Sequence, residues 1–390
     1  MHIIVADDDL SQRIHLSAML RRNGHDVELA EDGEEAIEAL KRNGAPVLIC
    51  DVQMPGIDGM ELATRVRGLD LGRYVYILMV TGLDQNADRM RGLEAGADDF
   101  MSKPVDQAVL LARLRSAERL IRYERDLHSK NLRLAQANEH IQADLDAAAA
   151  AQRALLPDPE VLLSNCRFSS SFTPSSSISG DVFGYFDLGP GKSGFFAADV
   201  SGHGVRAALS AVALGYMVST EFFQNMVRGT GTDELRPERV AQVLDRRFQR
   251  DLGDDSYFTL FVGAIDEAEE RLVFCQAGYP SPLLLRPGDE ARIVGTGGVP
   301  VAMLPHAEFE RSSVAFRRGD RLIVASDGVT EAASQGGELY GLERFSEFVT
   351  HRQGFAARAV LPQIANALLD WTGQPNLADD VSIIIIDKEG

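Results

Sequence analysis

One stretch divides this sequence: neither proline nor glycine occurs between Pro104 and Pro157. These two residue types most often end a helix, so their absence over such a length predicts one continuous helix. A single compact core cannot be built across a helix of that kind. We therefore expect two globular parts joined by a connector, which is also the natural organisation of a 390-residue chain.

Apolar side chains recur within the connector, residues 106–156, at a strict seven-residue spacing. This row consists of Leu120, Leu127, Leu134, Ile141, Ala148 and Leu155, and its companion row of Glu124, Asn131, Asn138, Leu145 and Gln152. A heptad row predicts a left-handed coiled coil, and asparagine at core positions favours a two-stranded, in-register pair. We expect a parallel homodimer through this helix. The polar companion row also fits a long solvated helix packed on its own chain, and both interpretations stay open.

The composition limits the classes of protein that the chain can belong to. It is 45% hydrophobic and 25% charged, as in globular proteins, and has a net charge of −19, which argues against a general nucleic-acid binder. No run of 18 apolar residues occurs, and the first residues do not resemble a signal peptide, so we expect no membrane segment. Three scattered cysteines form no metal-binding spacing and fit a reducing cytoplasm.

The first part, residues 1–120, alternates short apolar runs with amphipathic stretches. Five strands that alternate with helices predict an α/β domain with a doubly wound, flavodoxin-like parallel sheet. Its polar residues lie where strands end, and carboxylates grouped there favour a hard cation such as Mg²⁺. The residues at these strand ends are Asp7, Asp8, Asp9, Asp51, Thr81 and Lys103.

This part resembles the receiver domain of two-component response regulators. The matching pieces are the acidic pair Asp7-Asp8, the run DVQMPGIDG that begins at Asp51, Thr81-Gly82 and Lys103-Pro104. The resemblance implies that Asp51 accepts a phosphoryl group from a sensor histidine kinase. It also implies that Mg²⁺ is held by Asp7, Asp8, Asp51 and the backbone carbonyl of Gln53.

The same resemblance assigns three further residues. Thr81 and Lys103 would contact the phosphoryl oxygens, and Phe100 matches the aromatic switch residue of the family. The alternative is a flavodoxin-like domain whose acidic loop is merely solvated, which is the preferable interpretation for Asp9 alone. Motif matches gain force only from their context, and here the whole set occurs at the expected spacing.

The last part, residues 157–390, has strands in succession with helices inserted as blocks, which predicts an α+β fold of sheets covered by helices. We expect helices over residues 206–223, 237–252, 342–351 and 355–372. Residues 162–177 are rich in serine and are expected to form a loop or an edge strand. The residue pattern further predicts that Asp327 follows its strand in a glycine turn.

Aspartates lie at the ends of four strands in this part: Asp181, Asp199, Asp327 and the pair Asp379-Asp380. A carboxylate at the tip of a buried strand is costly unless a positive charge meets it, and no Lys or Arg follows Asp199 until Arg206. Four such residues from separate segments predict one hard-cation site. Two adjacent ions bound there would suit hydrolysis of a phosphate monoester.

This part is similar to metal-dependent serine/threonine protein phosphatases (PPM family) of the bacterial stage II sporulation E type. The matching pieces are AQRALLP at 151–157, SGD at 179–181, ADVSGHG at 198–204, SDGVTEA at 326–332 and DDVSIII at 379–385. The resemblance implies a β-sandwich flanked by helices and two Mn²⁺ or Mg²⁺ ions. It implies that the catalytic metal ligands are Asp181, Asp199, Asp327, Asp379 and the carbonyl of Val200.

The resemblance leaves some assignments open. It does not decide which member of the Asp379-Asp380 pair coordinates, and His203 lies near the metals but is more often structural in such a turn. Two positions depart from the family pattern. Gly184 stands where a second acidic residue is common, which could weaken metal occupancy, and Tyr279 replaces the usual histidine, which could alter substrate contacts.

Two functions remain in view. In the first, phosphorylation of Asp51 controls dephosphorylation of a phosphoserine or phosphothreonine protein, and the resemblance implies that this substrate is an anti-sigma-factor antagonist. In the second, an inactive phosphatase-like fold is an adaptor that binds a sigma factor or another regulator for proteolysis or sequestration. The four retained aspartates favour the enzyme. A DNA-binding regulator is disfavoured because no basic recognition helix follows the receiver-like part.

Overall fold

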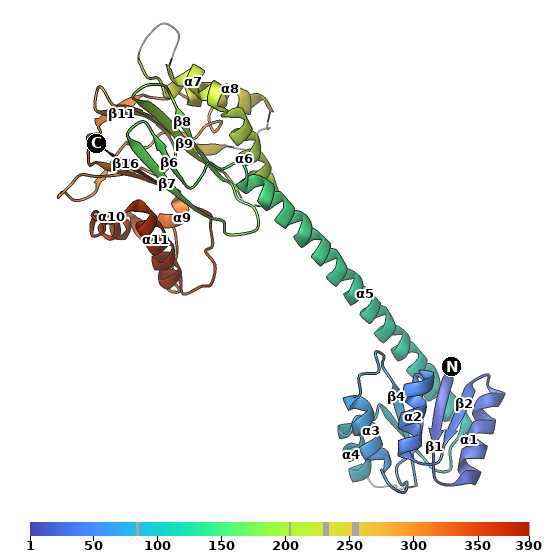
Figure 1. Cartoon of the computed structure of the whole chain (residues 1–390). Helices are drawn as coiled ribbons and strands as arrows, with labels where there is room; N and C mark the ends of the chain where they lie inside the picture. Colours follow the sequence, from blue (N-terminus) through green and yellow to red (C-terminus); the bar gives the residue numbers. More distant parts are fainter. Residues whose placement is uncertain (83–85, 203, 229–233, 252–256, 390) are drawn as a thin grey trace. The chain divides into compact units, whose positions relative to one another are not determined.

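The computed structural model describes residues 1–82, 86–202, 204–228, 234–251 and 257–389 (Figure 1). Its contacts divide the chain into two compact units, Met1–His140 and Ile141–Gly390, and each is described by itself. None of the helices in this described part is long and apolar enough to cross a membrane.

The N-terminal unit is a five-stranded parallel sheet with helices on both faces, as predicted. The strand order is β2-β1-β3-β4-β5, the doubly wound order in which the carboxyl ends of β1 and β3 lie side by side. Its elements are β1 (His2–Ala6), α1 (Leu10–Arg22), β2 (Asp26–Ala30), α2 (Gly33–Asn43), β3 (Val47–Asp51), α3 (Gly59–Gly68), β4 (Tyr76–Thr81), α4 (Asn86–Glu94) and β5 (Asp99–Ser102).

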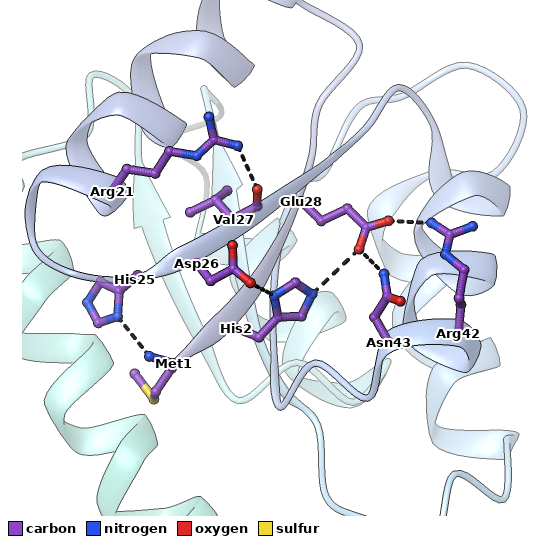
Figure 2. Close-up of polar contacts among 9 residues, drawn as sticks. All are labelled: Met1, His2, Arg21, His25, Asp26, Val27, Glu28, Arg42 and Asn43. Carbon is purple, nitrogen blue, oxygen red and sulfur yellow. Dashed lines mark hydrogen bonds and ion pairs between the residues drawn. The ribbon is translucent and has the colours of Figure 1, made fainter.

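A network of polar side chains ties the edge strand β2 to its neighbours (Figure 2). The His2 ring on β1 lies 2.8 Å from a carboxylate oxygen of Asp26 and 3.5 Å from one of Glu28. Glu28 also accepts hydrogen bonds from Arg42 and Asn43 at the end of α2. Because Asp26 and Arg42 are largely exposed, such pairs add little stability.

The connector is one helix, α5 (Gln107–Arg153), so the predicted continuous helix is confirmed. Its first turns pack on the N-terminal sheet through Leu110, Leu114, Ala117 and Ile121. Beyond them the heptad row is exposed on the single chain: Leu127, Leu134 and Ile141 are 55%, 60% and 56% exposed.

The last turns of α5 pack on the C-terminal unit. Leu145 and Ala149 contact Ile178 and Ala208, and Gln152 is buried. The companion row of the heptad pattern therefore faces its own chain at Leu145 and Gln152. At this end α5 therefore packs on its own chain, which is the second of the two alternatives predicted for the connector, because Ile178 and Ala208 cover that side of the helix.

The C-terminal unit is a sandwich of two antiparallel sheets, of order β14-β11-β10-β9-β8 and β13-β12-β15-β16-β7-β6. Its strands are β6 (Glu160–Leu163), β7 (Cys166–Thr173), β8 (Asp181–Asp187), β9 (Lys192–Val200), β10 (Phe258–Asp266), β11 (Arg271–Ala277), β12 (Leu283–Leu285), β13 (Arg292–Ile293), β14 (Ser312–Ala315), β15 (Arg321–Ala325) and β16 (Val381–Lys388). Its helices are α6 (Val205–Met217), α7 (Thr220–Arg228), α8 (Glu238–Asp251), α9 (Asp327–Thr330), α10 (Gly341–Thr350) and α11 (Ala357–Thr372).

The alternation of side chains along each strand creates three apolar layers. In β10, Phe261 points between the sheets, where it packs with Phe195 and Phe274, while Leu260 and Val262 face the helices. Helices α6 to α8 cover the outer face of the first sheet, and α9 to α11 cover that of the second (Figure 1). The predicted fold class, an α+β sandwich flanked by helices, is confirmed.

Three local predictions were wrong. Residues 162–177 contain the end of β6 and all of β7, and β7 lies inside its sheet because it pairs with β16 on one side and with β6 on the other. The helix expected over 206–223 is two helices, because the Ser219 hydroxyl accepts a hydrogen bond from the Phe222 N–H and starts α7. Asp327 does not enter a glycine turn but begins the short helix α9.

Candidate functional site

Two neighbouring strands present the first pair of aspartates. Asp181 is the first residue of β8 and lies directly opposite Asp199, near the end of β9, in the antiparallel register. Residues paired in this way project to the same face of a sheet. That face looks into the interior of the sandwich. Phe183 and Ala197, each two positions from the aspartate of its own strand, belong to the core between the sheets.

The second sheet supplies Asp327 and Asp379. Asp327 follows β15, and Asp379 lies just before β16, which is the strand beside β15. Ser326 joins the two segments: its N–H donates to the Ser382 carbonyl and its hydroxyl accepts from the Ser382 N–H, both at 2.9 Å. The four strand ends therefore meet at one end of the sandwich.

A pocket of about 420 Å³ opens at this end. Asp199, Asp327 and Asp379 line it, together with Val200, and Asp181 lies next to Asp199 with only 1% of its surface exposed. The structure thus brings together the residues that the sequence singled out. Within the described residues, only Asp7, Asp8 and Asp51 place three ligand atoms within 4.8 Å of one another, so the pocket aspartates are more widely spaced than that trio.

The carboxylates of the pocket disfavour one another's charge. Burial, followed by the charge of Asp199, raises the pKa of Asp181 well above its usual range. Burial, followed by the charges of Asp327 and Asp379, raises the pKa of Asp199 to about 8. The pKa of Asp327 is also raised, by burial and then by Asp379. These shifts are those of clustered acids that no cation neutralises.

The donor set fits divalent metal ions. Both carboxylate oxygens of Asp181 are buried and have no hydrogen-bond partner, and none of the four aspartates forms an ion pair with a Lys or Arg among the described residues. Buried carboxylates are tolerated when they are paired or coordinate a metal. Oxygen-only donors of this kind suit Mg²⁺ or Mn²⁺, and Val200 lines the same pocket.

The structure distinguishes the two adjacent C-terminal aspartates. Both oxygens of the Asp380 carboxylate accept hydrogen bonds from the β7–β8 segment, from Ser175 and from the Gly180 N–H. Among the described residues, Asp379 accepts a hydrogen bond only from the N–H of Asp380, at 2.8 Å, and its side chain is exposed at the pocket. Asp379 is thus the member of the pair with oxygen capacity left for a ligand.

A second acidic site lies at the carboxyl ends of β1 and β3. The carboxylates of Asp7, Asp8 and Asp51 offer oxygens within 4.8 Å of one another. The Lys103 ammonium lies 2.9 Å from Asp7 and 2.7 Å from Asp51, so it contacts two of the three carboxylates. The remaining negative charge and the oxygen donors fit Mg²⁺.

The other residues predicted for this receiver-like site lie near the same edge of the parallel sheet. Gln53 and Asp8 line a pocket of about 540 Å³. Thr81 ends β4, and its carbonyl accepts a hydrogen bond from the Lys103 N–H. Phe100 on β5 is 5% exposed and packs beneath Gly92, where any Cβ would overlap its ring. Asp9 does not join the trio, because its side chain caps α1 by accepting from the Ser11 N–H at 2.7 Å.

The comparison with known families decides the identity of the larger unit. A model of the family described as Stage II sporulation protein E (SpoIIE) matches residues 189–389, about half of the chain. This chain belongs to the SpoIIE family. A second family model, Response regulator receiver domain, matches residues 3–115. The chain therefore carries a receiver domain ahead of its SpoIIE domain.

Individual proteins resemble parts of this SpoIIE-family chain. Response regulator MprA of Mycobacterium avium is 40% identical over 129 residues, which are 33% of this chain and 56% of the relative. MprA of Mycobacterium leprae is 42% identical over 116 residues, 30% of this chain and 50% of the relative. The chain thus spans about half the length of the curated relatives it matches.

A solved structure resembles the SpoIIE domain. The SiaA-PP2C domain of Pseudomonas aeruginosa has a TM-score of 0.56 at 19% sequence identity, and the match covers 65% of this chain and 99% of that chain. At this identity the likeness shows the fold alone, which is a PP2C-type sandwich.

The two departures from the SpoIIE pattern have different surroundings. Gly184 and Asp181 lie on opposite faces of β8, and a Cβ at Gly184 would come within 2.8 Å of the Phe196 ring. A carboxylate at this position would therefore point away from the pocket. Tyr279 is fully buried between the sheets, and its pKa is raised by burial and then by the charge of Asp181, so this tyrosine lies beneath the aspartate pair.

Sequence reasoning missed two residues near the SpoIIE pocket. The charge of Glu331, at the end of α9, contributes to the raised pKa values of Asp199 and Asp327. Its place in the SDGVTEA run was a signal that could have found it. Gln152 was assigned to the heptad pattern, although its place in the AQRALLP run was a signal that could have linked it to the phosphatase part; its contact with Ser179 is seen only in the structure. His203 lies outside the described residues.

Proposed function

We propose that this chain is a phosphorylation-controlled response regulator whose output is metal-dependent dephosphorylation of a phosphoserine or phosphothreonine protein. The observation that carries the proposal is the convergence of Asp181, Asp199, Asp327 and Asp379 from four separate segments on one pocket, with no described Lys or Arg to neutralise them. We assign residues 1–120 to the receiver domain, 106–156 to the helical coiled-coil linker and 157–390 to the phosphatase domain.

In the phosphatase domain, Asp181, Asp199, Asp327, Asp379 and the Val200 carbonyl would hold two Mn²⁺ or Mg²⁺ ions. When bound, such ions would supply an activated water and neutralise charge on the phosphoryl oxygens. The chain's own contribution is a preformed acidic pocket whose ligands are fixed on strands. The pocket is also lined by Ser201, whose hydroxyl accepts a hydrogen bond from the Tyr257 N–H and could donate its own hydrogen to a phosphoryl oxygen.

In the receiver domain, Asp51 would accept the phosphoryl group from a sensor histidine kinase. Asp7, Asp8, Asp51 and the Gln53 carbonyl would hold Mg²⁺. Lys103 already contacts Asp51 and is placed to meet a phosphoryl oxygen, as is Thr81 at the end of the adjacent strand. The resulting change would reach the face of β5 through Phe100, the proposed switch residue.

The linker would carry this change between the two domains. The exposed row that contains Leu127, Leu134 and Ile141 supports a parallel homodimeric coiled coil along the middle of α5. At the end of the helix, the Gln152 side chain donates to the Ser179 carbonyl at 2.6 Å and accepts from the Ser179 N–H at 3.1 Å. Ser179 lies two residues before Asp181, so movement of the helix would move a metal ligand.

The proposed substrate and cellular compartment follow from the family resemblance and from the charge of the chain. The substrate would be a phosphorylated anti-sigma-factor antagonist, and the protein would act in the cytoplasm without binding nucleic acid or membrane. A net charge of −19 fits a protein partner better than a nucleic acid.

The test is turnover by the full-length chain in the presence and absence of Mn²⁺, first with p-nitrophenyl phosphate and then with a phosphoserine protein. We expect hydrolysis that depends on Mn²⁺. The Asp199→Ala variant should hydrolyse at least about 100-fold more slowly, because it lacks one of the four carboxylates proposed to hold the metal ions. Beryllofluoride on Asp51 should change the rate. Equal, metal-independent background in both proteins would contradict the enzyme and favour the adaptor.

A further inference from the structure

We propose that Asp380 is a positioning residue that holds the ligand-bearing segments of Asp181, Asp327 and Asp379 in register for metal binding. The inference rests on the proposed metal site and adds to it a residue that touches neither metal nor substrate. It is carried by the hydrogen bonds of Asp380, which reach segments more than 50 residues apart in the chain on either side of the pocket.

The Asp380 side chain fixes the segment that leads into β8. One oxygen accepts from the Ser175 N–H at 2.7 Å and from the Ser175 hydroxyl at 2.9 Å. The other accepts from the Gly180 N–H at 2.9 Å. Gly180 is bonded directly to Asp181, so the carboxylate closes the Ser175–Gly180 loop and fixes the point at which Asp181 enters the sheet.

The Asp380 backbone fixes the segment that carries Asp327. Its carbonyl accepts a hydrogen bond from the Ser326 hydroxyl at 3.2 Å. Gly328 packs so closely against the same carbonyl that a Cβ at this position would overlap it. Asp327 lies between these two contacts. Asp379 is the preceding residue, and its carboxylate is oriented by the Asp380 N–H at 2.8 Å.

The hydrogen bonds that the Asp380 carboxylate accepts, rather than its negative charge, explain why a carboxylate is suited to this position. Negative charge at Asp380 opposes ionisation of Asp181 and Asp199, because it adds to the acid cluster. Hydrogen bonds from backbone N–H groups to an ionised acceptor are, however, stronger than neutral ones, and this carboxylate accepts two of them and one hydroxyl. An asparagine would keep one acceptor oxygen, but its amide N–H₂ would face either the Gly180 N–H or the two Ser175 donors.

This arrangement predicts a specific defect when Asp380 is removed. In Asp380→Ala the backbone contacts to the Asp327 and Asp379 segments remain, but the Ser175–Gly180 segment that leads to Asp181 loses its three hydrogen bonds to them. Metal affinity should therefore fall, while catalysis by the metal-loaded site should be largely retained, because excess metal restores the arrangement. A residue that acted only on overall stability would not separate these two quantities.

The experiment measures Mn²⁺ affinity by electron paramagnetic resonance of free Mn²⁺, in full-length chains that all carry Asp8→Ala to remove the receiver site. We expect Asp380→Ala to raise the dissociation constant at the pocket at least tenfold, and Asp380→Asn to raise it less. The control is Asp266→Ala, which removes a buried carboxylate that, like that of Asp380, accepts from two backbone N–H groups, those of Ala268 and Glu269, at the far end of β10. This control should keep the parent affinity.

Native Mn²⁺ affinity in folded Asp380→Ala would overturn the positioning role. If that variant does not fold, Asp380→Asn and Ser175→Ala, which removes one of the three hydrogen bonds, decide the question: unchanged affinity in both contradicts the inference. Hydrolysis of p-nitrophenyl phosphate at saturating Mn²⁺ should recover in the affected variants. A parent that binds no Mn²⁺ at the pocket removes the proposed metal site itself, which distinguishes failure of the function from failure of the inference.

Discussion

Asp181 and Asp199 are directly opposed residues of two adjacent antiparallel strands, and both point into the interior of the sandwich. Two carboxylates in this relationship repel each other, and burial keeps water from screening them. The fold therefore places unfavourable charge at the end of β8 and β9 unless protons or cations occupy the site. This relationship has consequences for stability that can be measured without any substrate.

The metal-free protein should become less stable as the pH rises. The folded-state pKa of Asp199 is about 8, against an ordinary value of 3.8, and the pKa values of Asp181 and Asp327 are also raised. Between these values the folded chain holds protons that the unfolded chain has released, so stability is lost from about pH 4 to about pH 8. In EDTA, thermal unfolding of Asp199→Asn should show a flatter pH dependence than that of the parent, and Mn²⁺ should raise the parent's Tm more at pH 8 than at pH 5. Identical pH dependence in parent and variant would contradict this.

Phosphorylation of the receiver domain should require Asp51 but not its near neighbour Asp9. Asp51 contacts Lys103 at the acidic site, whereas Asp9 caps α1. With acetyl phosphate as donor, Asp51→Asn should abolish the shift in phosphate-affinity electrophoresis. Asp9→Ala should keep that shift and lose about 1 kcal/mol of folding stability, the typical value of a helix cap. A phosphorylated band in Asp51→Asn would refute the assignment.

The exposed heptad row should hold two chains together. Leu134 lies on the row and is 60% exposed, whereas Leu132 is 53% exposed and lies off it. Burial of a leucine contributes about 1.5–3 kcal/mol, so Leu134→Lys should raise the dimer dissociation constant at least about tenfold. Sedimentation equilibrium measures this constant directly. Leu132→Lys is the matched control and should sediment as the parent does; equal effects of both changes would argue against the seam.

Coupling between the domains should depend on Gln152. This buried side chain makes two hydrogen bonds to the Ser179 backbone, and its loss leaves polar groups unsatisfied at about 1–3 kcal/mol each. In Gln152→Ala, the ratio of Mn²⁺-dependent rates with and without beryllofluoride should move towards one. Gln142→Ala is the control, since Gln142 lies on the same helix and makes only exposed side-chain contacts, with Asp146 and Ser177, among the described residues. A native ratio in Gln152→Ala would remove this residue from the coupling path.

Sequence patterns predicted the elements whose signals are local. The strand ends that carry Asp51, Asp199 and Asp327 stand out because short apolar runs precede them, and their positions in the sheets follow from the order of strands. The connector was equally plain, because nothing in residues 105–156 interrupts a helix. Both domain folds were therefore predictable from the sequence.

The features that were not predicted depend on contacts between distant segments. The serine-rich region that contains β7 was predicted to be a loop or an edge strand. Strand β7 instead pairs with β16, more than 200 residues away in the chain, and buries Phe168 on one face while Ser169 points to the other. The choice between Asp379 and Asp380 likewise depends on Ser175 and Gly180, which only the folded chain brings near. Periodicity carries no information about such partners.

Anomalous scattering from crystals of the full-length chain grown in excess Mn²⁺ tests the central claim most directly. The account predicts two peaks about 3.5–4 Å apart in the pocket, contacted by the carboxylates of Asp181, Asp199, Asp327 and Asp379. The receiver trio of Asp7, Asp8 and Asp51 provides an internal positive control, because the same crystal should show a peak there. A peak at the receiver trio with none in the pocket would contradict a metal-dependent phosphatase.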